Sequence, residues 1–120
     1  MSLSTTGFDD ALDYKVIHET ASTNTLNTNV ATTDGKLFSV KLVNGSSSAA
    51  YLKIFDANKP VIGTTSPIII LPVAGSGTIF YDIPGGIEFT TLSFASTLNP
   101  NPLDATAPSG STVAVTLVCG

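Results

Sequence analysis

Cys119 and His18 are the two side chains of this sequence that could act as a nucleophile and a general base. A cysteine attacks as a thiolate, and a nearby imidazole commonly takes its proton. The two residues lie near opposite ends of the chain, and no spacing pattern places them together. The chain also has no G-x-S-x-G or S-x-x-K motif, two arrangements that present a serine nucleophile. The sequence therefore predicts that the protein is not an enzyme and that Cys119 is a small apolar residue at the end of a strand.

Residues that could bind a metal or a cofactor are also few. His18 is the only histidine, so one chain cannot build a zinc site from several imidazoles. Asp9, Asp10 and Asp13 cluster, but the spaced oxygen ligands and forced turn of a calcium loop do not follow them. A solvated acidic segment, or the start of a short helix over Phe8–Tyr14, explains them better. We expect no metal and no cofactor.

The composition favours a protein that works through its surface. The chain has 120 residues, 12% of them charged, five lysines, no arginine and a formal net charge of −4. An acidic chain without arginine is poorly suited to bind nucleic acid or an anionic membrane. A surface with so few charges is unusual for a free monomer and suits a protein packed against copies of itself or a larger assembly. One cysteine excludes an intrachain disulfide, and the start Met1–Gly7 shows no signal peptide, so we expect an intracellular origin.

Apolar and polar residues alternate with a period of two in many segments, which predicts strands. Lys36–Asp56 contains two such runs around Asn44–Ser48 and is expected to form a β-hairpin whose Lys36, Lys41 and Lys53 side chains are solvated. The clearest strand, Thr112–Val118, should lie inside a sheet. Further strands are expected at Tyr14–His18, Ile68–Val73, Thr78–Ile83, Ile87–Phe89 and Leu92–Thr97, with turns at Gly75–Gly77 and Pro84–Gly86.

About seven or eight short strands separated by turn residues predict an all-β fold, an antiparallel β-sandwich or a jelly-roll-like arrangement. Residues 35–120 are expected to form this sandwich domain, and residues 1–34 a polar N-terminal arm or peripheral segment. Glu19–Thr33 has only Leu26 and Val30 as large apolar residues. It could be an exposed arm, a weakly paired polar edge strand around Thr25–Ala31, or a segment ordered only by a partner.

The segment Asn99–Ser111 contains three prolines and one glycine and is expected to be a long loop. Loops of this length in small domains tend to be functional or to make contacts. The predicted partner contacts are Leu26 and Val30 in the arm and, in the loop, Asn99, Pro100, Asn101, Pro102 and Leu103.

Three stretches carry a resemblance to a known family. They are AAYLKIFDA at 49–57, GTTSPIIILPV at 63–73 and GTIFYDIPGGIEFTTLSFA at 77–95. Together they resemble a small β-sandwich module in virion proteins of tailed bacteriophages, of the type found in phages of marine and freshwater bacteria. The final strand, Thr112–Val118, also looks like the end of that module. The resemblance implies a virion component and carries no catalytic residues.

From these observations we expect a structural protein of a phage virion, assembled in the host cytoplasm. The leading hypothesis is a capsid decoration (cement) protein that binds the major capsid protein or another virion protein, as a homo-oligomer such as a trimer. The alternative is a tail- or fibre-associated module that binds a receptor or a glycan. Such a module needs aromatic or charged loop residues, and the long loop offers only Asp104.

Overall fold

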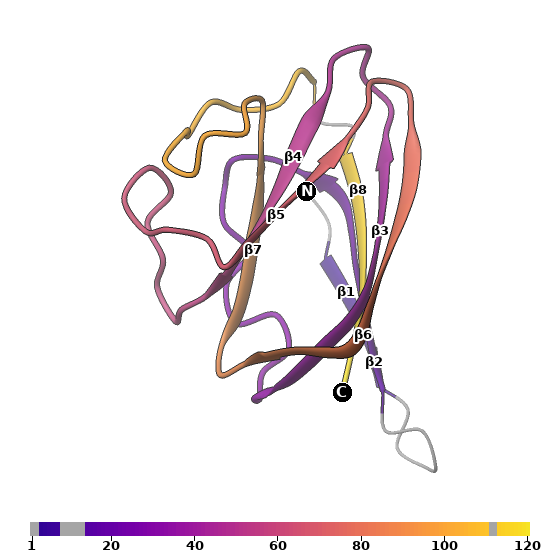
Figure 1. Ribbon diagram of the computed structural model, residues 1–120, viewed down its shortest axis with the longest axis vertical. Helices are drawn as coiled ribbons and strands as arrows, with labels where there is room; N and C mark the ends of the chain where they lie inside the picture. The colour runs from indigo at the N-terminus through magenta and orange to yellow at the C-terminus, as the bar shows by residue number, and fades with distance from the viewer. Residues whose placement is uncertain (1–2, 8–13, 111–112) are drawn as a thin grey trace.

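The computed structural model describes residues 3–7, 14–110 and 113–120. In this part of the chain all regular elements are antiparallel strands, and they form two sheets that face one another as a β-sandwich (Figure 1). The predicted all-β sandwich is therefore confirmed. The proposed helical turn at Phe8–Tyr14 and the three early aspartates lie in or reach into residues 8–13, outside the described residues. No helix in the described ranges has the length and apolar character to cross a membrane.

The larger sheet has five strands and the smaller sheet has three among the described residues. The five-stranded sheet runs in the order β1 (Leu3–Gly7), β2 (Lys15–Ser22), β8 (Val113–Cys119), β3 (Gly35–Asn44) and β6 (Thr78–Phe89). The three-stranded sheet runs in the order β5 (Ile69–Val73), β4 (Ala50–Asp56) and β7 (Leu92–Thr97).

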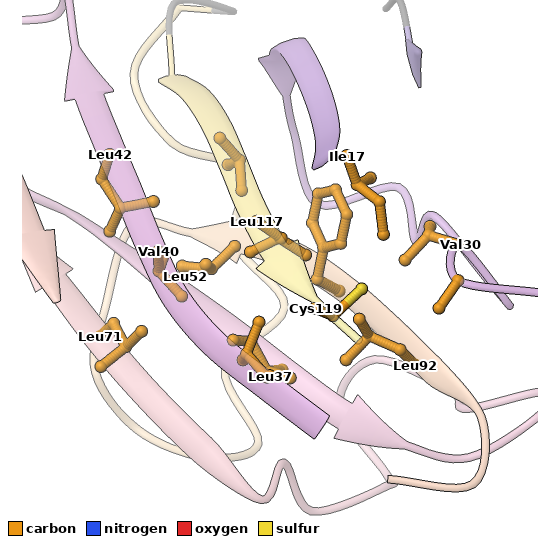
Figure 2. Packing of buried hydrophobic residues seen from close by; sticks show 14 of the residues in the cluster. Ile17, Val30, Leu37, Val40, Leu42, Leu52, Leu71, Leu92, Leu117 and Cys119 are labelled. Carbon is orange, nitrogen blue, oxygen red and sulfur yellow. The ribbon is translucent and has the colours of Figure 1, made fainter. Parts of the chain in front are cut away.

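The core lies between the two sheets, and the alternation of β8 shows how it is built. Val113, Val115, Leu117 and Cys119 are buried, while the residues between them are partly exposed. They meet apolar residues of β3, β4 and β7 in one cluster (Figure 2). The strand predicted at Thr112–Val118 thus lies between β2 and β3, inside a sheet as expected. Cys119 is part of this cluster and ends the strand, as predicted for a small apolar residue.

The two runs of Lys36–Asp56 are strands, but the predicted hairpin is wrong. β3 pairs with β6 and β8, whereas β4 pairs with β5 and β7 of the opposite sheet. The buried side chain of Asn44 shapes the crossing: its Nδ2 donates to the Ser48 carbonyl at 2.8 Å, and its Oδ1 accepts from the Ser46 amide at 3.1 Å. Asn44 also donates to the carbonyl of Ala74, at 3.3 Å, so a distant turn fixes the direction of the chain.

The glycines at Pro84–Gly86 form a bulge within β6 instead of the predicted turn. Leu37 pairs with Ile87 and Ser39 with Asp82, so β6 carries extra residues between these two pairs. Gly85 and Gly86 adopt φ values of 79° and 76°, which glycine tolerates better than other residues. Because β6 is an edge strand, Pro84 can lack an N–H group without breaking a ladder on both sides.

The predicted boundary between an arm and a sandwich at residue 34/35 needs correction. β2 lies between β1 and β8, and its Ile17 is buried in the common core. A sheet with β8 at its centre needs a strand on each side of β8, and β2 supplies one of them. Residues 15–34 therefore belong to the sandwich.

The segment after β2 follows the free edge of β7. Asn27 and Phe94 exchange two backbone hydrogen bonds of 2.9 Å, and the Val30 amide donates to the Leu92 carbonyl at 2.8 Å. Of the three alternatives for Glu19–Thr33, the structure supports the weakly paired polar edge strand. Val30 and Ala31 of this segment are buried in the core. The polar composition of the segment gave no indication of this.

Candidate functional site

The outer face of the three-stranded sheet is covered by loops of the same chain. Lys53 and Phe55 of β4 point away from the central cluster, yet both are buried. The β7–β8 loop and the β4–β5 loop lie on this side of the molecule, away from the five-stranded sheet (Figure 1). This makes β4 a strand with two buried faces and places the predicted contact loop over it.

Lys53 holds the β7–β8 loop from beneath. Its side chain is 0% exposed, and its Nζ donates to the backbone carbonyls of Asn101 at 2.5 Å and of Asp104 at 2.9 Å. Burial lowers the pKa of Lys53 from its ordinary value, and the nearby Asp104 carboxylate opposes that effect. A buried ammonium group is tolerated only where acceptors replace its water. The expectation that Lys53 is solvated is therefore wrong, because a loop about 50 residues further along the chain covers it.

Asp104 closes the loop on itself. Its carboxylate accepts hydrogen bonds from the Thr106 hydroxyl at 2.8 Å, from the Thr106 amide at 3.3 Å and from the Asn99 amide at 3.3 Å. Partial burial alone would raise the pKa of Asp104, but the hydrogen bonds from Thr106 and Asn99 outweigh it and lower the pKa. The Leu98 amide donates to the Thr106 carbonyl at 3.0 Å and completes the closed loop.

This loop presents the predicted contact residues to solvent. Asn99, Pro100, Asn101 and Pro102 are exposed, and Leu103 is 50% exposed. The backbone beneath them is held, since the Leu103 amide donates to Asn101 Oδ1 at 2.9 Å and the two prolines restrict their own φ angles. An apolar side chain on a fixed backbone loses little conformational entropy when a partner binds it.

A second loop lies beside the first. A Cβ built on Gly63 would lie 3.6 Å from Ala105 Cβ and 3.7 Å from the Leu103 carbonyl oxygen, so the two backbones are in contact range. Val61, on this second loop, is 58% exposed. We call residues 98–108 together with residues 60–65 the loop surface. It combines a backbone held by hydrogen bonds, few charges and two exposed large apolar side chains, Val61 and Leu103.

The other predicted contact residues lie elsewhere. Val30 is buried in the core and Leu26 is half-buried beside β7, so Val30 cannot serve as a contact residue in this fold. Sequence reasoning missed the structural roles of Lys53 and Asp104. Lys53 alternates with Leu52 and Ile54, as a solvated lysine would, so the only available signal of its burial was the apolar Phe55 two residues later on the same face.

The structure keeps Cys119 and His18 apart. His18 Nδ1 lies 2.8 Å from the Thr116 hydroxyl on the solvent-facing side of β2 and β8, whereas Cys119 faces the core. Burial raises the pKa of the Cys119 thiol, and the positive charge of Lys15 only partly offsets this, so the thiolate is disfavoured.

Comparisons with protein-family models, curated proteins and solved structures found no match to this chain.

Charged residues gather at one end of the sandwich without forming a recognisable site. An open hollow there is lined by residues that include Asp34, Lys36, Asp56 and Glu88. Asp56 Oδ1 already accepts from the amides of Thr90 and Thr91, both at 2.9 Å. Over the described ranges, no three His, Cys, Asp or Glu side chains are placed to hold a metal ion. The loop surface is therefore the strongest candidate for function.

The carboxylate of Asp104 should stabilise the folded protein only above acidic pH. Because the pKa of Asp104 is lower in the folded protein than the ordinary value of 3.8, the ionised form favours folding. Its contribution is present above pH 3.8 and is lost as the pH falls through the lower folded-state value. We expect the difference in unfolding free energy between the wild-type chain and Asp104→Asn to be constant near neutrality and to shrink towards pH 2, when measured by urea unfolding.

Glu88→Gln is the control, because Glu88 is an exposed carboxylate on β6 outside the loop. A difference for Asp104→Asn that stays the same from neutral pH to pH 2 would contradict the role given to its carboxylate.

Proposed function

We propose that this chain is a structural protein of a tailed-phage virion, a capsid decoration protein that binds the major capsid protein through the loop surface. The observation that carries the proposal is Leu103, half exposed on a loop whose backbone is held by Lys53 and Asp104. An apolar tip held on a loop with few charges suits a permanent contact with another protein.

Two further features support the proposal. The charged fraction of 12% and the absence of arginine make contact with other proteins more suitable than contact with nucleic acid. The stretches that resemble the phage module include β4, β5, β6 and the first part of β7, so the resemblance spans strands of both sheets. A protein of this kind acts by shape in the assembled virion, without a cofactor or an enzymatic step, and associates with copies of itself.

Counting copies in purified virions tests the location. Quantitative mass spectrometry should find hundreds of copies per particle, the number that a capsid lattice requires. A handful of copies would favour the tail or fibre alternative, in which the chain binds a receptor or a glycan. Complete absence from virions would remove the proposal.

A binding experiment tests the surface. Capsids that lack the chain are titrated with purified wild-type protein and with Leu103→Asp, which places a charge at the exposed apolar tip. We expect about a tenfold or greater loss of affinity, as is typical when a central apolar contact is replaced. The matched control is Ile68→Asp, because Ile68 is 47% exposed but lies outside the loop surface. Equal affinities for Leu103→Asp and wild type would exclude this surface.

A further inference from the structure

The free edges of the two sheets are not equally protected. The outer edge of β7 is followed by the segment that contains Asn27, and β5 carries Pro72, whose carbonyl accepts a hydrogen bond from the Tyr81 hydroxyl. β1 is only five residues long. Short strands, prolines and covering segments are the usual means by which proteins keep sheet edges from pairing with other chains.

β6 is the exception. It is the longest strand in the described part of the chain, with 12 residues, and it forms the last strand of its sheet (Figure 1). Its second half is protected by Pro84 and by the bulge at Gly85 and Gly86. The first half, Thr78–Ile83, has neither device, and its Phe80 is 67% exposed. One row of backbone N–H and C=O groups therefore faces away from β3 along an apolar segment.

We propose that the Ile79–Ile83 edge pairs antiparallel with the same segment of a second copy of this chain, about a two-fold axis at Tyr81. In this register Phe80 lies opposite Asp82 of the second copy, and Ile79 lies opposite Ile83 of the second copy. The two five-stranded sheets then continue into one another, and the free backbone groups of Ile79–Ile83 gain possible partners.

The charges near this edge complement one another in that register. Lys41 pairs with Phe80 across β3 and β6, and its Nζ lies 5.5 Å from the centre of the Phe80 ring. The ammonium group thus extends over Phe80 towards the outer edge, where Asp82 of the second copy arrives. Two-fold symmetry creates this Lys41–Asp82 attraction twice.

The pairing is independent of the virion function, because it uses a surface other than the loop surface. It also changes the expected form of self-association. Antiparallel pairing of identical strands has two-fold symmetry, so it produces a dimer in place of the trimer expected from the sequence.

Light scattering on the full-length protein as it elutes from a size-exclusion column tests the inference. Protein concentrations of about 1 µM to 1 mM cover the range in which weak dimers form. We expect the mass to rise from that of one chain to that of two. Phe80→Asp, which places a carboxylate opposite Asp82 of the second copy, and Asp82→Lys, which places an ammonium group beside Lys41 of the second copy, should each raise the dissociation constant about tenfold or more. Combining Asp82→Lys with Lys41→Asp should recover most of the affinity. Leu103→Lys, on the loop surface, should leave the dimer unchanged, and circular dichroism verifies that each variant is folded.

Three outcomes would overturn the inference. The first is the mass of a single chain at every concentration, and the second is the mass of three chains. The third is a dimer that neither Phe80→Asp nor Asp82→Lys weakens, since that dimer must use another surface.

Discussion

Replacing Lys53 with methionine is expected to lower the free energy of unfolding by about 2 kcal/mol and to loosen the loop surface. The substitution keeps a long apolar stem in the buried site but removes the ammonium group that donates to the carbonyls of Asn101 and Asp104. Hydrogen bonds from a charged donor contribute about 1.5–3 kcal/mol each. Relief from burying a charge offsets part of that loss, which is why the expected change is below the sum of two such bonds.

Two measurements separate the effects on the fold and on the loop. Urea unfolding gives the stability change, and amide hydrogen exchange should be faster at Thr106 and at its partner Leu98. The same variant should bind the capsid about tenfold more weakly, because the tip at Leu103 is no longer held in place.

The matched control is Lys36→Met. Lys36 is an exposed lysine on β3, so the same chemical change there should alter stability by less than about 0.5 kcal/mol. If Lys53→Met is as stable as the wild-type chain and its loop amides exchange equally slowly, the buried lysine does not anchor the loop.

Gly75→Ala should destabilise the fold by about 3 kcal/mol, the upper part of the range for overpacked sites. A Cβ at this position would lie 2.2 Å from the Ser47 carbonyl oxygen and 2.5 Å from its carbon. These are backbone atoms, so no side-chain rotation can relieve the clash. The two segments are joined here, since the Ser76 amide donates to the Ser46 carbonyl at 2.7 Å. Both connections, β3 to β4 and β5 to β6, cross between the sheets at this point.

Gly85→Ala distinguishes steric overlap from the loss of a glycine. A Cβ on Gly85 has nothing within 4 Å, so the main cost there is its φ of 79°. That cost is about 1 kcal/mol for a residue with a side chain. Thermal unfolding of both variants should therefore show a clearly larger drop in melting temperature for Gly75→Ala. Equal drops would mean that the contact with Ser47 yields easily and does not hold the two crossings together.

The sequence alone was sufficient for the class of fold and for most strands. A period of two, as in Val113, Val115 and Leu117, depends only on neighbouring residues and on having one buried face, so it is visible without knowing the partner strands. Pro72 likewise marked β5 as an edge or a strand end, because proline cannot donate to a ladder. The exposed tip at Leu103 was also predictable, since the prolines around it exclude regular structure.

The tertiary structure alone decided how the strands pair and what covers them. The hydrogen bond from Asn44 to the carbonyl of Ala74, 30 residues away, directs the chain after β3 towards the opposite sheet. Val30 is buried because its segment runs along β7 and closes the core there. Lys53 occupies an alternating position that would suit a solvated face. The β7–β8 loop nevertheless buries it, and its ammonium group donates to two carbonyls of that loop. Periodicity shows that a strand has one apolar face. Only long-range contacts determine whether its other face meets water or another part of the chain.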